Sequence, residues 1–105
     1  MKYHVVYITA ADETEARKIG RTLVEERLVA CVNIHPVQSI YRWQGRVEES
    51  KEFAILAKTS NGMVGKVINR VKGLHSYHVP DIVSWQIEKG NPDYLKWIGE
   101  STEEV

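Results

Sequence analysis

Hydrophobic positions near the start of the chain change their spacing, and the change separates a strand from a helix. A run of β-forming residues from Tyr3 to Thr9 predicts a strand that is buried on much of both faces. Asp12 and Glu15 then provide the N-cap and the carboxylate that favour a helix start. Apolar residues three and four positions apart predict that this helix is amphipathic: Ala16, Ile19, Gly20, Leu23 and Val24.

The middle of the chain is extended over an unusual length. Val29 to Ile34 predicts a second strand, and the extended pattern resumes from Ser39 to Gln44. Pro36 lies between these segments and has no backbone N–H, so a bulge or bend is expected there. After a turn at Gln44-Gly45 the chain returns to an apolar stretch, Phe53 to Ala57, which is expected to form a central strand.

The second half repeats a helix and a strand. Ser60 and Asn61 can cap a helix, and its apolar face is marked by Val64, Val67, Ile68 and Val71. Apolar and polar residues alternate from Asp81 to Glu88, which predicts a fourth strand. Asn91 followed by Pro92 is typical of a helix start and predicts a short final helix.

The resulting order, β-α-β-β-α-β with a final helix, predicts an α+β fold of the ferredoxin-like type, in which two helices cover one face of an antiparallel sheet. The 105 residues leave no room for a second hydrophobic core, so residues 1–105 are expected to form a single domain. The first and last strands are about half as long as the middle two. The central hairpin is therefore expected to extend beyond the sheet.

The extended part of the hairpin carries apolar and aromatic residues where an unpaired ribbon usually carries charge. Ile40, Tyr41 and Trp43 lie there with Arg42 beside them, a composition that resembles the anchors of protein interfaces. An alternative is that Tyr41 and Trp43 only fill an edge of the core. We favour the interpretation that the hairpin pairs with other copies of the chain.

Composition limits the classes of partner. The chain is 43% apolar and 27% charged, as in folded globular proteins. Its 14 basic and 14 acidic residues cancel, so no net field attracts nucleic acid or an anionic membrane. No apolar run approaches the roughly 20 residues of a membrane span. The start of the chain shows no signal peptide, and the single cysteine, Cys31, cannot form an internal disulfide, so a cytoplasmic location is expected.

Three residues near the fourth strand are candidate metal ligands. His75 and His78 lie three residues apart and close to Asp81, and imidazole with carboxylate suits Cu(II), Zn(II) or Ni(II). Copper or zinc is thus a candidate ion, with no obligatory cofactor. The alternative is that His75 is a hydrogen-bonded residue of an interface or cleft. Cys31 stands between Ala30 and Val32 and is expected to pack in the core.

Five blocks, in order along nearly the whole chain, carry a family resemblance. They are Glu26 to Ile34, Ser39 to Gly45, Lys58-Thr59, His75 to Ile82 and Tyr94 to Ile98. Together they resemble the CutA family of divalent-cation tolerance proteins, a more specific match than one short motif could provide. The resemblance implies a ferredoxin-like homotrimer, similar in architecture to PII signalling proteins, whose long hairpins pair between subunits.

The same resemblance implies a function in the tolerance of copper and other divalent metal ions, and no settled catalytic activity comes with it. We therefore expect a protein that acts by binding and is not an enzyme. Members of the family often have a cysteine in the first strand that can bind copper. Ile8 stands at the matching position here, so the resemblance transfers no thiolate copper site to this chain.

Three other functions are compatible with the order of elements. An RNA-recognition module would need stacking aromatics and a basic motif on the third strand, but Glu48 to Phe53 has one aromatic among acids. An acylphosphatase-type enzyme could use Asn33, Arg42 and Arg46, although no glycine-rich anion cradle accompanies them. The third is a PII-like regulatory module that binds a small anionic ligand at clefts between subunits.

Overall fold

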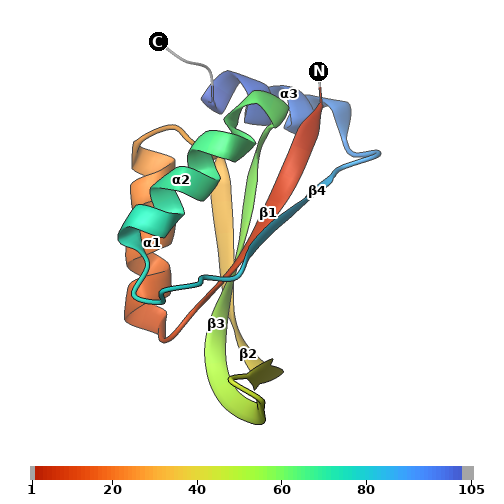
Figure 1. Cartoon of the computed structure of the whole chain (residues 1–105). Coiled ribbons are helices and arrows are strands. Elements are labelled where there is room, and N and C mark those ends of the chain that lie inside the picture. The colour runs from red at the N-terminus through yellow and green to blue at the C-terminus, as the bar shows by residue number, and fades with distance from the viewer. Residues whose placement is uncertain (1, 103–105) are drawn as a thin grey trace.

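The computed structural model describes residues 2–102. The elements are β1 (Tyr3–Ala10), α1 (Glu13–Glu25), β2 (Cys31–Trp43), β3 (Arg46–Ser60), the short 3-10 helix η1 (Asn61–Met63), α2 (Val64–Leu74), β4 (Ile82–Gln86) and α3 (Pro92–Ser101). The strands form one antiparallel sheet in the order β2-β3-β1-β4. α1 and α2 lie side by side on one face of the sheet, and α3 lies at one end of it, near the N-terminus (Figure 1). The predicted α+β fold of the ferredoxin-like type is confirmed.

The hydrophobic core lies between the sheet and the first two helices. Its fully buried side chains come from alternate positions of β1 and β3 and from one face of each helix: Val6, Ile8, Ile19, Leu23, Ile55, Ala57, Val67 and Val71. Burial of one large aliphatic side chain contributes about 1.5–3 kcal/mol. A Cβ atom on Gly20 would lie 2.8 Å from Cγ2 of Val32, so a glycine there allows α1 to approach β2 closely.

The first helix begins as predicted. The Asp12 carboxylate accepts a hydrogen bond from the Glu15 N–H at 2.8 Å, and the Glu15 carboxylate accepts one from the Ala11 N–H at 3.1 Å. Of the predicted apolar face only Val24 is exposed, because it lines an open groove between α1 and the outer edge of β2.

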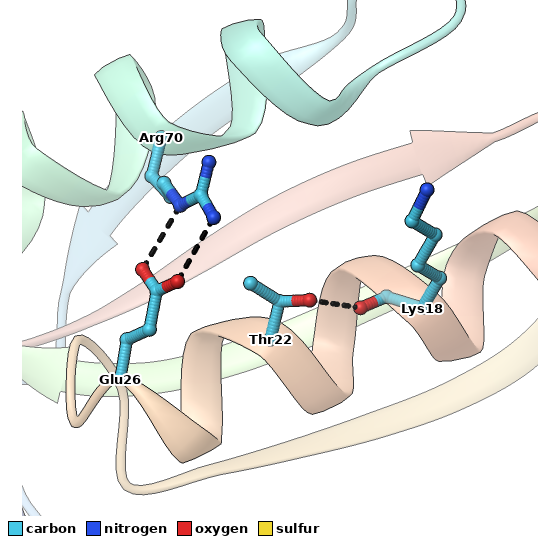
Figure 2. Close-up of polar contacts among 4 residues, drawn as sticks. All are labelled: Lys18, Thr22, Glu26 and Arg70. Atoms are coloured by element: carbon cyan, nitrogen blue, oxygen red, sulfur yellow. Dashed lines mark hydrogen bonds and ion pairs between the residues drawn. The ribbon is translucent and has the colours of Figure 1, made fainter.

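An ion pair joins the two helices away from the core. Arg70 on α2 donates through Nε and Nη2 to the two carboxylate oxygens of Glu26, each at 2.9 Å (Figure 2). The same view shows the Thr22 hydroxyl donating to the Lys18 carbonyl oxygen at 2.8 Å. The hydrogen bonds between Arg70 and Glu26 lower the pKa of Glu26 and raise the pKa of Arg70. Solvent screens this exposed pair, so its contribution to stability is small.

The central hairpin pairs without interruption. The register runs from Cys31 opposite Lys58 to Trp43 opposite Arg46. The predicted bulge near Pro36 is wrong, because Pro36 lies directly opposite Phe53 within one continuous β2. β2 is an edge strand, and a proline is tolerated there because its missing N–H can face the side that has no neighbouring strand.

The hairpin extends beyond the sheet, as predicted. β1 pairs with β3 only from Phe53 to Ser60, so the segment from Arg46 to Glu52 pairs with β2 alone. We call the two-stranded part, residues 37–52, the ribbon; it projects away from the helices (Figure 1). Its two-residue turn has positive φ at Gln44 (50°) and Gly45 (78°), which matches the twist of the paired strands.

The second half differs from the prediction at its boundaries. Ser60 does not cap α2, because its hydroxyl instead lies 3.0 Å from that of Thr102 and η1 precedes the helix. β4 covers only Ile82–Gln86, which is shorter than predicted. The predicted start of α3 is confirmed, with the Asn91 side chain accepting from the Asp93 N–H at 3.1 Å. No helix within residues 2–102 is both long enough and apolar enough to cross a membrane.

Candidate functional site

His75 is the first residue after α2, and both of its ring nitrogens make hydrogen bonds. Nε2 lies 2.7 Å from the carbonyl oxygen of Thr9, and Nδ1 lies 3.1 Å from the backbone nitrogen of Tyr77. A carbonyl oxygen can only accept, so Nε2 carries the proton and Nδ1 accepts from the Tyr77 N–H. The ring is therefore held in one neutral tautomer. A metal ion could bind Nδ1 only by displacing the Tyr77 N–H.

The other two candidate ligands are more exposed. Asp81 accepts a hydrogen bond from the Thr9 hydroxyl at 3.4 Å, so Thr9 contacts both His75 and Asp81. His78 is exposed and makes no hydrogen bond with the described residues. Within residues 2–102, no three His, Cys, Asp or Glu side chains are arranged so that they could hold a metal ion. His75 and Asp81 therefore both contact Thr9, whereas His78 does not share this contact.

Two carboxylates hold the connector between α2 and β4 in place. Glu15 accepts from the Ser76 N–H at 2.8 Å, and Glu52 accepts from the Tyr77 hydroxyl at 2.8 Å. Glu52 is only 6% exposed although it lies where the ribbon leaves the sheet. Burial and the hydrogen bond to Glu52 raise the pKa of Tyr77. Partial burial would raise the pKa of Glu15, but its hydrogen bonds, chiefly with Ser76, outweigh this and lower the pKa.

The candidate interface residues lie on the surface of the ribbon. Ile40 is 70% exposed, and Tyr41 and Trp43 are also exposed. The Ser50 hydroxyl donates to the Tyr41 hydroxyl at 3.4 Å. The interpretation in which Tyr41 and Trp43 fill an edge of the core does not fit this exposure. An uncovered group of large side chains on a two-stranded ribbon is typical of a docking surface.

The face of the sheet opposite α1 and α2 carries a polar cluster that the sequence did not predict. Cys31 and Lys58 lie directly opposite each other on β2 and β3, and the Lys58 Nζ lies 2.7 Å from the Asn33 Oδ1. The Cys31 Sγ lies 3.1 Å from the hydroxyl of Tyr94 on α3. We call these four residues the Lys58 cluster. The expectation that Cys31 packs in the core is wrong: it is half-buried and hydrogen-bonded.

Aromatic side chains of β1 and β4 lie on the same face of the sheet as the Lys58 cluster, and Trp97 lies beside Tyr94 on α3. The rings of Tyr94 and Trp97 have centroids 5.4 Å apart, and those of Tyr7 and Trp85 have centroids 6.2 Å apart. Trp85 and Trp97 are both exposed. Strand alternation places residues 31, 33 and 58 on one face, a signal visible in the sequence. The contribution of Tyr94 depends on how α3 packs across the sheet, for which the sequence has no local signal.

The fold and these sites together define a class: ferredoxin-like α+β proteins with a projecting aromatic ribbon and polar clusters suited to binding. Within this class, the chain belongs to the CutA1 divalent ion tolerance protein family, whose profile matches residues 4–101. The resemblance found in the sequence is thereby confirmed.

Similar proteins come from distant organisms. The divalent-cation tolerance protein CutA of Thermus thermophilus is 52% identical over 99 residues, which cover 93% of this chain and 96% of that protein. The Protein CutA homolog of Xenopus laevis is 43% identical over 90% of this chain and 63% of its own length. The solved structure of the periplasmic divalent cation tolerance protein CutA from Archaeoglobus fulgidus has a TM-score of 0.94 and 40% identity, covering 96% of this chain and 99% of that chain.

Proposed function

We propose that this chain is a single-domain, cytoplasmic homotrimer that takes part in the response to metal ions by binding divalent cations, with copper as the first candidate and zinc as the second. It acts by binding and has no enzymatic activity. Membership of the CutA1 divalent ion tolerance family is the observation that carries the proposal. The ribbon is the observation that supports self-association.

The exposed ribbon supports assembly on energetic grounds. Ile40, Tyr41 and Trp43 remain in water in the isolated chain, and burying apolar surface contributes about 25 cal/mol for each Å². A ribbon of two strands is also only marginally stable by itself. Pairing of ribbons from three chains buries these side chains and stabilises the ribbon at the same time.

The proposed metal site consists of His75 and Asp81, and His78 becomes a third ligand only when the connector moves, because the three side chains are not grouped in this structure. Histidines that bind metals usually donate their other ring N–H to a carbonyl or carboxylate, which orients the ring. The Nε2–H bond from His75 to the Thr9 carbonyl oxygen is of this kind and leaves Nδ1 as the ligand atom. The Tyr77 N–H must then give up Nδ1, so we expect binding to be accompanied by a shift of the connector.

Native mass spectrometry with metal analysis of the purified chain tests assembly and metal binding together. We expect a mass of three chains with bound copper or zinc. A monomer at micromolar concentration would contradict the trimer. Calorimetric titration with copper and zinc then compares the wild type with His75→Ala. His35→Ala serves as the control, because His35 is exposed on β2 and lies outside the proposed site. Equal isotherms for the wild type and His75→Ala would remove His75 from the site.

The cellular location of the chain and its lack of enzymatic activity are tested separately. The relative from Archaeoglobus fulgidus is described as periplasmic, so cell fractionation of the native host decides whether this chain differs from it. A steady-state assay with a simple acyl phosphate checks the absence of acylphosphatase activity. Turnover above the buffer rate that is lost in Arg42→Ala would contradict a function by binding alone.

A further inference from the structure

Lys58 presents a positive charge that has no counter-ion in the described part of the chain. As a whole residue, Lys58 is half-buried on the face of the sheet opposite α1 and α2. Its hydrogen bond goes to the neutral amide oxygen of Asn33 at 2.7 Å, and no carboxylate of residues 2–102 forms an ion pair with it. A charge that loses part of its contact with water is stabilised most by an opposite charge. A neutral amide oxygen compensates only part of that loss.

The neighbours of Lys58 add donors and no negative charge. Asn33 uses its oxygen to accept from Lys58, so its NH₂ group remains free to donate. Cys31 and Tyr94 share one internal hydrogen bond at 3.1 Å and have two hydrogens between them. Whichever of the two donates, one S–H or O–H remains available. The ammonium itself has two further hydrogens.

Tyr94 strengthens the local preference for a negatively charged ligand. Its ring lies 5.7 Å from the Lys58 Nζ, which helps to hold the ammonium in position. The hydrogen bond to Cys31, together with burial, raises the pKa of Tyr94 to about 12. The phenol therefore stays protonated at neutral pH and places no negative charge beside the ammonium.

We propose that Lys58, Asn33, Cys31 and Tyr94 form an oxyanion-binding site that takes a carboxylate or a phosphate. The ammonium supplies the charge, and the Asn33 amide and the Cys31–Tyr94 pair supply oriented donors. Charge-assisted hydrogen bonds of this kind are roughly twice as strong as neutral ones. The PII-like alternative predicts a site for a small anionic ligand, and these four residues are our candidates for that site. Binding of the anion there requires no metal ion.

This site is separate from the proposed metal site. Lys58 and Glu52 lie on the same face of β3, about 20 Å apart at roughly 3.3 Å per residue, and Glu52 contacts the connector through Tyr77. A positive ammonium also repels a divalent cation. Loss of one site therefore leaves the other intact, so the two proposals can fail independently.

The oxyanion can come from two sources, a free small anion or a side-chain carboxylate of a neighbouring copy. Titrating the intact protein with sodium phosphate and with sodium acetate, at constant ionic strength set by chloride, tests the first. Sedimentation equilibrium of the same proteins tests the second. Asn33→Asp is the main variant, because it keeps the shape of the side chain and gives Lys58 an internal carboxylate. Lys58→Met is the second variant, and Lys18→Met is the matched control, because Lys18 is exposed on α1 and lies outside both the ribbon and the Lys58 cluster.

For a free anion, the wild type and Lys18→Met bind phosphate or acetate saturably, and Asn33→Asp and Lys58→Met bind about tenfold more weakly or worse, as expected for loss of a hydrogen bond to a charged group. For a carboxylate of a neighbouring copy, free anions do not bind, but both variants weaken self-association and Lys18→Met does not. Both results support the site. The proposal is overturned when neither titration nor association distinguishes Asn33→Asp and Lys58→Met from Lys18→Met.

Discussion

The same two strands, β2 and β3, behave differently in the two halves of their length. Between Phe53 and Lys58, β3 pairs with β1 on one side and β2 on the other, and its inward side chains Ile55 and Ala57 are fully buried. Between Arg46 and Glu52 it has β2 alone, and most of its side chains are exposed. One pair of strands therefore contains a part that stabilises itself and a part that has no core of its own.

The difference shows where stability and recognition are located. In the body of the sheet, burial under the helices is sufficient to hold the strands. In the ribbon the strand hydrogen bonds are present, but the large apolar side chains Ile40, Trp43 and Val47 are exposed. Large exposed side chains are retained on the ribbon, which fits a function in association and does not fit one in folding.

The largest expected effect is on the free energy of unfolding, and it distinguishes the body of the sheet from the ribbon. Ile55→Ala leaves a cavity in the core and should lower the free energy of unfolding by about 2–5 kcal/mol. Ile40→Ala lies on the ribbon, and in dilute protein it should change the same quantity by about 0.5 kcal/mol or less. Urea unfolding of both variants at two protein concentrations measures this. A concentration-independent loss from Ile40→Ala as large as that from Ile55→Ala would show that the ribbon belongs to the core.

Most of the fold could be predicted because its signals are local. The apolar spacing of α1, the Asp12 cap and the unequal strand lengths lie in continuous segments, and each predicted its element. The error at Pro36 has a different origin. A proline disturbs a strand that donates to neighbours on both sides, and the sequence does not say that β2 is an edge strand. Strand order is a property of the whole sheet.

The candidate site could be predicted less well for the same reason. The tautomer of His75 depends on Thr9, which is distant in sequence and adjacent only after folding. Cys31 has apolar neighbours, and alternation alone leaves two equivalent faces. The packing of α3 makes one of those faces polar through Tyr94. Residue types near His75 were therefore visible in the sequence, whereas the Lys58 cluster required the tertiary structure.

The second prediction tests the ribbon as an interface. Trp43→Ala should weaken self-association by at least about 2 kcal/mol, because truncation of a buried aromatic anchor usually costs this much. Gln38→Ala, an exposed change on the same ribbon, is the control and should leave association unchanged. Light scattering across a dilution series reports both. Equal dissociation of the two variants would place the interface away from Trp43.

The third prediction concerns the junction between the two halves, where Tyr77 donates to the buried Glu52. Tyr77→Phe should lower the free energy of unfolding at pH 7 by about 1–3 kcal/mol, since the carboxylate loses a donor. The raised pKa of Tyr77 means that the folded protein holds this proton more tightly than the unfolded chain does. The resulting stability is complete below the ordinary value of 10.0 and is lost as the pH rises through the raised pKa.

Unfolding measured between pH 9 and 12 checks the sign. The free energy of unfolding of the wild type should fall more steeply with pH than that of Tyr77→Phe. Glu52→Gln removes the negative partner of the phenol, so its free energy of unfolding should also fall less steeply with pH than that of the wild type. Parallel curves for the wild type and both variants would mean that this hydrogen bond does not control stability at the junction.

The smallest expected effect is at the tip of the ribbon. Gly45 has a φ of 78°, and a residue with a Cβ atom in this region costs roughly 1–2 kcal/mol, so Gly45→Ala should weaken the turn by about 1 kcal/mol. Gln44→Asn should act in the opposite direction, because asparagine tolerates a positive φ better than glutamine does. If the ribbon is formed only in the assembly, both changes alter self-association and leave unfolding of the dilute chain unchanged. The reverse result, with altered unfolding and unchanged association, would show that the ribbon folds with the body and that the tip makes no contribution to pairing.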